Sequence, residues 1–271
     1  MEKLQAALEK ARSRRAVGTP AGKAEKLHAQ TTGQPKRLAQ LWAELPEIKL
    51  SGTALHQHHI VTQQASHQAT PFDILRTKIL LQMRQNGWKS LAITSPMPKS
   101  GKTTMACNLA LGLGRQGELR TVLFDLDLQD PSVGDFLGHT PSAHIADMLA
   151  GRVTFAEQAV RIGDSVAVSM ATDSENDPTR VLLAEQTRET LKAIETHYRP
   201  DIMIYDTPSI LVSDNTRSFL KNVDCALIVT RANNTKYGHF DACEREIAEY
   251  TNVIGVVLNA LPTKKIEATL E

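Results

Sequence analysis

The hydrophobic pattern alternates between short apolar runs and longer stretches with helical spacing through most of the chain. Near-continuous apolar runs predict buried strands, and apolar positions three or four residues apart predict helices between them. This alternation predicts an α/β fold with a doubly wound, mostly parallel sheet covered by helices on both faces. The predicted strands are 90–94, 121–127, 166–170, 201–206, 225–230 and 253–258, and the clearest helical stretches are 71–85 and 178–197.

The first part of the chain has a different pattern. Residues 1–15 place small and apolar side chains on one helical face, and the first 40 residues carry nine Lys and Arg against three Glu. We therefore predict a basic N-terminal extension over 1–65, with an amphipathic helix and a Gly- and Pro-containing linker. The helix is either a solvated arm or a docking element for a partner or an anionic membrane surface. Trp42 is either a binding anchor or a cap on the core.

The remainder of the chain divides into a predicted catalytic domain over 66–265 and a short tail over 266–271. The net charge of the 271 residues is +1, which argues against general nucleic-acid binding. No apolar run approaches 18 residues, and the charged start does not fit a signal peptide. Cys107, Cys225 and Cys243 lack metal-ligand spacing, so we expect reduced thiols in a cytoplasmic protein.

Candidate chemistry begins where the strand 90–94 runs into a loop that ends Gly101-Lys102-Thr103-Thr104 and leads into a helix. This context is typical of a phosphate-binding loop, in which backbone N–H groups cradle phosphates and a lysine reaches the outer ones. The motif has glycine five residues before Gly101, where this chain has Pro96. The residues that we assign to the phosphates are Pro98, Lys99, Ser100, Gly101, Lys102, Thr103 and Thr104.

Carboxylates end two other predicted strands, where a parallel sheet would place them beside this loop. Asp125 and Asp127 end one strand, and Asp206 ends another. Because Mg²⁺ takes hard oxygen ligands, we expect Mg²⁺ here together with a nucleoside triphosphate. Thr103 is the expected direct metal ligand and Asp206 the outer-sphere one. The candidate catalytic residues are Lys102, Asp125, Asp127 and Asp206, with Asp125 and Asp127 free to orient or deprotonate an attacking hydroxyl.

The segments 98–103, 122–127 and 202–208 resemble the Walker A, Walker A′ and Walker B motifs of bacterial tyrosine kinases, within the MinD/ParA-type group of deviant Walker A ATPases. The resemblance implies a P-loop NTPase fold with ATP and Mg²⁺ as cofactors. It also implies phosphoryl transfer and a Wzz-like membrane co-polymerase as partner in exopolysaccharide biosynthesis. In the wider group the asparagine corresponding to Asn259 contacts adenine, and we assign Arg231 to the nucleotide with it.

Two features depart from the family. Its kinases end in a tyrosine cluster, whereas this chain has no tyrosine after Tyr250. Of the family's oligomerising Glu-x-x-Arg-x-x-Arg motif, only the final Arg76 is present. Tyrosine phosphorylation and assembly into a homo-oligomer therefore both stay open.

Three functions are compatible with the sequence. The first is an ATPase or kinase-like switch in exopolysaccharide biosynthesis, at the inner face of the membrane only through a partner or the basic N-terminal helix. The second is a ParA/MinD-like positioning or partitioning ATPase, which would carry a second lysine close to Met97. The third is a module that binds ATP without turnover, and the strand-end acids argue against it.

Overall fold

The computed structural model of the protein describes residues 33–262. The chain divides into two units, residues 1–40 and 41–271. The helix predicted over 1–15 and the tail over 266–271 lie outside the described residues. Among the helices of residues 33–262, none combines the length and apolar character needed to cross a membrane.

A seven-stranded sheet forms the centre of the larger unit, with the strand order β3-β4-β2-β5-β1-β6-β7. All neighbouring strands pair in parallel except β3 and β4, which are antiparallel. The mostly parallel sheet predicted from the sequence is therefore confirmed. The strands are β1 (Ser90–Thr94), β2 (Thr121–Asp125), β3 (Val160–Ile162), β4 (Val166–Ser169), β5 (Ile202–Asp206), β6 (Cys225–Arg231) and β7 (Asn252–Asn259).

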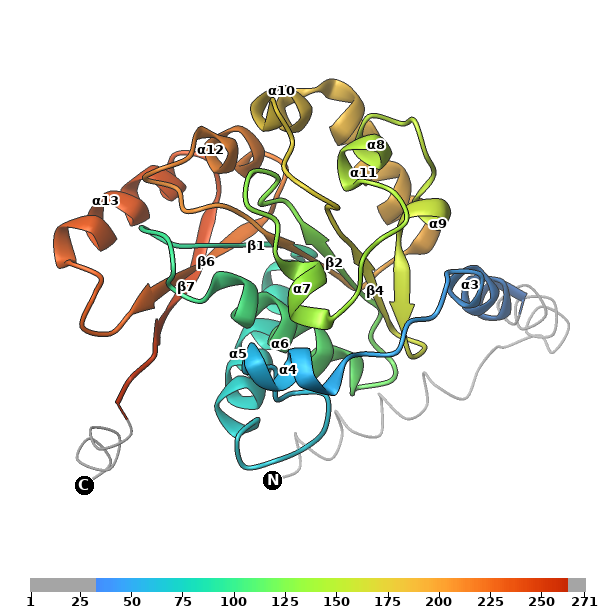
Figure 1. Ribbon diagram of the computed structural model, residues 1–271, viewed down its shortest axis with the longest axis horizontal. Helices are drawn as coiled ribbons and strands as arrows, with labels where there is room; N and C mark the ends of the chain where they lie inside the picture. Colours follow the sequence, from blue (N-terminus) through green and yellow to red (C-terminus); the bar gives the residue numbers. More distant parts are fainter. Residues whose placement is uncertain (1–32, 263–271) are drawn as a thin grey trace, which may run out of the picture. The chain divides into compact units, whose positions relative to one another are not determined.

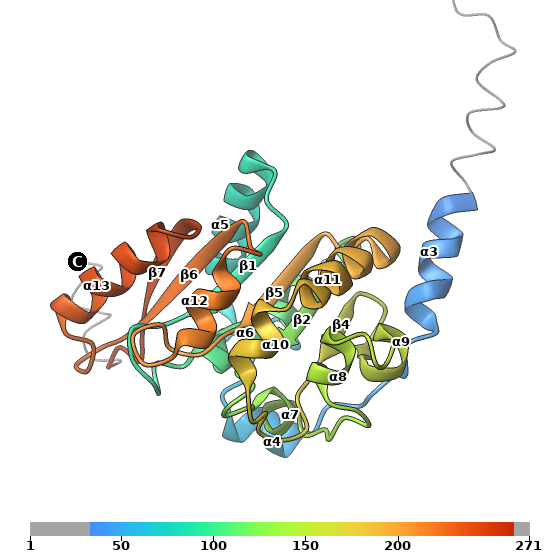
Figure 2. The ribbon, with the colours of Figure 1, turned by 90° about the horizontal axis from the view of Figure 1, so that it is seen from above.

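Helices cover both faces of this sheet (Figures 1 and 2). Helices α5 and α6 lie on one face, and α11, α12 and α13 lie on the other. The helices are α3 (Gly33–Ala43), α4 (Gly52–Gln57), α5 (Thr70–Asn86), α6 (Lys102–Gly114), α7 (Val133–Leu137), α8 (Ile145–Leu149), α9 (Phe155–Gln158), α10 (Pro178–Leu183), α11 (Glu185–Tyr198), α12 (Asp214–Leu220) and α13 (Tyr237–Ala248).

The helical pattern over 178–197 forms two helices instead of one. Ala184 has an extended backbone, with φ −61° and ψ 136°, and separates α10 from α11. The Thr187 hydroxyl is buried and donates to the Val181 carbonyl at 2.7 Å. This side-chain bond satisfies a carbonyl near the end of α10 and helps the chain turn into α11. Periodicity alone does not reveal such a break.

Helix α6 is apolar around most of its circumference because it lies between the sheet and other helices. Every residue from Met105 to Leu113 is buried. The helix contacts β1, β2 and β5 on one side and α5 and α7 on the other. The phosphate-loop helix is therefore part of the core, which fixes the position of the loop that precedes it.

Residues 41–65 belong to the same unit as the sheet, whereas the sequence placed the domain boundary at residue 65. Trp42 is 2% exposed, and its indole Nε1–H donates to the Tyr198 carbonyl at 2.9 Å. The backbone of Ile48 donates to the Arg161 carbonyl on β3 at 3.0 Å. Trp42 thus caps the core of this unit. Its role depends on partners more than 100 residues away, which local patterns cannot identify.

Arg76, which remains from the family's oligomerising motif, joins α5 to α6. Its guanidinium Nη1 donates to the Asp73 carboxylate and to the Gly112 carbonyl, both at 2.9 Å. Arg115 donates to the same carboxylate oxygen of Asp73 at 2.6 Å. The Arg76 side chain is 12% exposed, so these charge-assisted bonds are partly shielded from water. In this unit Arg76 holds two helices together.

We expect Arg76→Ala to lower the free energy of unfolding by about 1.5–3 kcal/mol, because the Gly112 carbonyl loses a bond to a charged donor. Urea denaturation followed by circular dichroism measures this change. Arg84→Ala is the matched control, since Arg84 lies exposed on the same helix. Equal stability of the two variants would contradict the structural role of Arg76.

Candidate active site

The loop between β1 and α6 has the geometry of an anion-binding loop. Gly101, at the N-cap of α6, has φ 91°, and Lys99 has φ 62° although it is not glycine. The Met97 carbonyl accepts bonds from the hydroxyls of Ser95 and Ser100, both at 2.8 Å. These bonds fold the loop back on itself. The left-handed backbone at Lys99 is the kind of strain that a fixed functional loop retains.

Asn259 at the end of β7 crosses to this loop and explains why residue 101 is glycine. The side-chain Nδ2 of Asn259 donates to the Ser100 carbonyl at 2.9 Å. A Cβ atom at Gly101 would lie 2.2 Å from that nitrogen. Any larger residue would therefore displace Asn259. In this structure the predicted base-binding asparagine also holds the phosphate loop in place.

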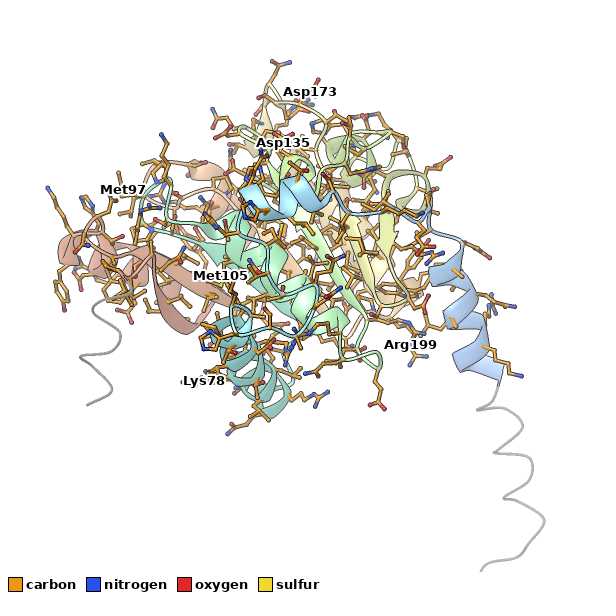
Figure 3. The ribbon with its side chains drawn as sticks, turned by 60° about the horizontal axis from the view of Figure 1, so that its bottom comes forward. Lys78, Met97, Met105, Asp135, Asp173 and Arg199 are labelled. Atoms are coloured by element: carbon orange, nitrogen blue, oxygen red, sulfur yellow. The ribbon has the colours of Figure 1, made fainter. Side chains whose placement is uncertain are left out.

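A pocket of about 420 Å³ lies over the loop. Its lining combines the loop with residues that follow β2 and β5, as expected for ligand binding at the carboxyl ends of parallel strands. Met97, labelled in Figure 3, marks the loop beside this pocket. The predicted residues in its wall are Pro98, Lys99, Gly101, Lys102, Thr103, Thr104 and Asp127. Ser100 is buried instead and contributes the loop's internal bonds.

The acids at the strand ends converge beside the same loop. Asp125 and Asp206 face each other in register on neighbouring strands β2 and β5. Asp206 Oδ2 accepts the Thr103 hydroxyl at 2.6 Å. Both carboxylates are 0% exposed, and within residues 33–262 the Oδ1 atom of each has no hydrogen-bond partner. The site therefore holds two neighbouring buried acids with unsatisfied oxygens, an arrangement that is costly without a cation.

Burial raises the pKa of all three acids. It raises the pKa of Asp206 to about 7, although Lys102 and the Thr103 hydroxyl oppose the shift. It raises the pKa of Asp125 well above its usual range, and the charge of Asp206 adds to the effect. It also raises the pKa of Asp127, against the charge of Lys102. Perturbed acids grouped beside one lysine are typical of a functional site.

This donor set fits Mg²⁺. The Oδ1 of Asp206, which has no hydrogen-bond partner within residues 33–262, and the hydroxyl of Thr103 are hard oxygen donors. Thr103 lies in the first turn of α6, whose N-terminus attracts phosphate, and Asp206 ends β5 beside it. When bound, Mg²⁺ would supply charge that neutralises both the buried carboxylates and the phosphate oxygens. Lys102, which lines the pocket, would supply the protein's own cation to those phosphates.

Asp125 and Asp127 have different surroundings, although the sequence grouped them. Asp127 lines the phosphate pocket. Asp125 does not, and its Oδ2 accepts backbone N–H groups of Ser132 and Val133 at 3.2 and 3.1 Å. It thereby anchors the start of α7 beside the site. Of the two acids, Asp127 is the one placed to orient or deprotonate an attacking group.

A second, larger pocket adjoins the first on the other side of Gly101 and contains Arg231 and Asn259. Arg231 Nη1 donates to the Lys99 carbonyl at 3.0 Å. The structure thus brings every predicted site residue close to the phosphate loop. Most of them line one or both of the two pockets, whereas Ser100, Asp125 and Asp206 are buried beside the pockets. Thr104 and Gly101 line both pockets.

Three further residues lie at the site without having been predicted from the sequence: Ser132, Ser209 and Phe136. Lys102 Nζ donates to the Ser209 hydroxyl at 3.3 Å, and the Ser132 hydroxyl lies 3.2 Å from that of Thr103. Phe136 lines the phosphate pocket from α7. Ser132 and Ser209 follow the same strands as the predicted acids. Their position after those strands could have identified them as site residues, because the loops that follow parallel strands lie at one edge of the sheet.

Comparisons with known proteins also indicate a nucleotide-binding domain. Residues 91–270 match the family described as the CobQ/CobB/MinD/ParA nucleotide binding domain. The putative tyrosine-protein kinase EpsB of Ralstonia solanacearum is 26% identical over 193 residues, covering 69% of this chain and 25% of EpsB. Tyrosine-protein kinase YwqD of Bacillus subtilis is 24% identical over 206 residues, covering 76% of this chain and 86% of YwqD.

A solved structure shares the fold. The kinase domain of the Escherichia coli tyrosine kinase ETK is 21% identical, with a TM-score of 0.67 over 74% of this chain and 78% of that domain. The predicted resemblance to bacterial tyrosine kinases is thereby confirmed. The chain spans about a quarter of the length of EpsB.

The raised pKa of Asp206 predicts how the stability of the metal-free protein depends on pH. The pKa of Asp206 is about 7 in the folded protein, whereas the pKa of an aspartate in an unfolded chain is about 4. Between these values the folded state binds more protons, so this group's contribution to stability is complete below about pH 4 and is lost as the pH rises through about 7.

In EDTA, we therefore expect the melting temperature of the wild type to fall by a few degrees more than that of Asp206→Asn between about pH 5 and 8. Differential scanning calorimetry measures this difference. Asp164→Asn serves as the control, because the Asp164 side chain is fully exposed. Melting temperatures of the wild type and Asp206→Asn that change in parallel with pH would contradict the raised pKa of Asp206.

Proposed function

The chain belongs to the CobQ/CobB/MinD/ParA nucleotide-binding family, and we propose from this premise that it is a Mg·ATP-dependent ATPase acting as a nucleotide-state switch. The observation that carries the proposal is one pocket lined by Lys102, Thr103 and Asp127 above the buried Asp206. Lys102 binds the outer phosphates, Thr103 and Asp206 hold Mg²⁺, and Asp127 positions the attacking water.

We place this switch in exopolysaccharide biosynthesis, controlling the length or export of the polysaccharide. The support is the likeness to proteins named as tyrosine kinases, together with the predicted family motifs. The proposed partner is a Wzz-like membrane co-polymerase. The excess of Lys and Arg in residues 1–40 supports contact with that partner or with an anionic membrane surface, so the protein works at the inner face of the membrane.

The tyrosines bear on whether this ATPase is also a kinase. Tyr205 is 1% exposed on β5, and burial raises its pKa strongly. Tyr198 is also buried, and Tyr250 is half-buried. Tyr237 differs, because it begins α13 and is 81% exposed. The sequence leaves tyrosine phosphorylation open, and among the four tyrosines the structure exposes the Tyr237 side chain most. We propose hydrolysis as the main activity and identify Tyr237 as the tyrosine to monitor.

We expect wild-type protein incubated with Mg·[γ-³²P]ATP to release labelled phosphate slowly without stoichiometric phosphotyrosine. Asp127→Asn should bind ATP normally and turn over about 10²-fold more slowly, because it loses a positioned acid or base. Lys102→Met should lose both affinity and turnover, since it removes the cation on the outer phosphates. Calorimetry measures the affinity for ATP, phosphate release measures the turnover, and mass spectrometry measures the amount of phosphotyrosine.

Tyr237→Phe is the control that shows whether any ³²P found on the protein is attached to Tyr237. Phosphotyrosine that approaches one per chain in the wild type, but is absent from Lys102→Met, would overturn the switch proposal and restore a kinase. Unchanged ATP affinity and unchanged turnover in Lys102→Met would remove the phosphate-loop assignment itself.

A further inference from the structure

One wall of the larger pocket beside the phosphate loop is formed by residues outside the sequence motifs. This pocket of about 920 Å³ shares Gly101 and Thr104 with the phosphate pocket. A nucleotide whose phosphates occupy the smaller pocket can therefore place its nucleoside in the larger one. Opposite Arg231 and Asn259, the wall is formed by residues 52–72, which precede the first strand of the sheet.

On the inner wall, the polar side chains of Asn259 and Arg231 are partly engaged by the phosphate loop and the adjoining backbone. The Asn259 amide donates to the Ser100 carbonyl and accepts the Ala260 N–H at 2.8 Å. The Arg231 guanidinium donates to the Lys99 carbonyl. These contacts stabilise the phosphate loop. A base edge presents several donors and acceptors in fixed positions, so polar groups on the other wall can add to the contacts that Asn259 and Arg231 remain able to make.

The outer wall offers such groups. Gln63 and Gln64 line the pocket and are exposed, and within residues 33–262 their side-chain amides make no hydrogen bond. Each amide presents a donor and an acceptor side by side. Phe72, at the start of α5, adds a half-buried ring to the same wall. An apolar surface with a few polar groups is the usual composition of a small-molecule site.

The backbone of this wall is attached to the phosphate-loop helix through Asn108. The Asn108 side chain is 0% exposed on α6; its Oδ1 accepts the Val61 N–H at 2.9 Å, and its Nδ2 donates to the His59 carbonyl at 3.0 Å. The Thr62 hydroxyl donates to the Asn108 carbonyl at 2.7 Å. Figure 3 shows the same face of the molecule, with Met105 labelled on α6. The outer wall is therefore positioned by the helix that binds the phosphates.

Backbone strain occurs on both walls of this pocket. His59 on the outer wall has φ 56°, and Ala260 on the inner wall has φ 55°. Left-handed conformations are unfavourable for residues other than glycine and persist where the surrounding structure enforces them. Asn108 supplies that constraint at His59. The pocket thus has defined backbone on both sides.

We propose that Gln63 and Gln64 read the edge of the nucleotide base and set base specificity, from a wall that Asn108 holds in register with the phosphate loop. The inference rests on the proposed function, because it requires a nucleoside triphosphate in the adjoining pocket. It assigns base discrimination to residues before the first strand of the sheet, outside the three family motifs.

The test compares a Gln63→Ala/Gln64→Ala double variant with the wild type by isothermal titration calorimetry, using Mg²⁺ complexes of ATP, GTP and inorganic tripolyphosphate. We expect the double variant to bind ATP about five- to tenfold more weakly, the scale of a lost hydrogen bond. Its Kd values for ATP and GTP should approach each other, and its affinity for tripolyphosphate should stay that of the wild type. Gln57→Ala is the matched control, an exposed glutamine on α4 outside the pocket.

The remaining outcomes contradict the inference in distinguishable ways. Equal ATP affinity in the double variant and the wild type would overturn it while leaving the proposed function intact. An equal loss of affinity for ATP and tripolyphosphate would also overturn it, because the wall would then support the phosphates. A wild-type protein that binds tripolyphosphate and ATP equally would show that no base is read. A wild-type protein that binds no ATP would overturn the proposed function and this inference together.

Discussion

Two buried carboxylates on neighbouring strands constrain the whole site. Asp125 and Asp206 pair in register at the ends of β2 and β5, and in the described part of the chain one oxygen of each has no hydrogen-bond partner. Packing around α6 excludes water from both, so the charged form of the pair is disfavoured until a cation is present. The Mg²⁺ ion of a bound Mg·nucleotide complex would supply that charge, and the fold thereby couples its own electrostatics to ligand binding.

The surrounding elements divide the work of binding. Gly101 and the left-handed Lys99 shape the loop, and Lys102 and Thr103 follow it at the start of α6 beside the acids. Helix α7 is connected to the acids because Asp125 accepts two of its first N–H groups. His58 stacks on Phe136 of α7 at a ring-centroid distance of 3.9 Å. A change at the acids can therefore be transmitted to α7 and to the segment that contains α4.

Much of the fold and of the phosphate site was predictable, because both follow from local patterns. Apolar runs that end in acids locate the strand ends, and a glycine–lysine–threonine sequence after a strand locates the loop. The division between Asp125 and Asp127 was not predictable, since it depends on which side chain reaches the amides of α7. The attachment of residues 41–65 was also hidden. It rests on scattered long-range contacts, such as those of Trp42, Ile48 and Asn108, that leave no periodic signal.

The most direct test of this account is the proton balance of Mg·ATP binding. With the pKa of Asp206 at about 7, close to half of its carboxyl groups carry a proton at that pH in the metal-free protein. Calorimetric titration of Mg·ATP at pH 7, in two buffers with different ionisation enthalpies, gives the number of protons exchanged. The account predicts a net release of about half a proton or more, and a markedly smaller release from Asp206→Asn. Binding heats that do not depend on the buffer, or net proton uptake, would contradict it.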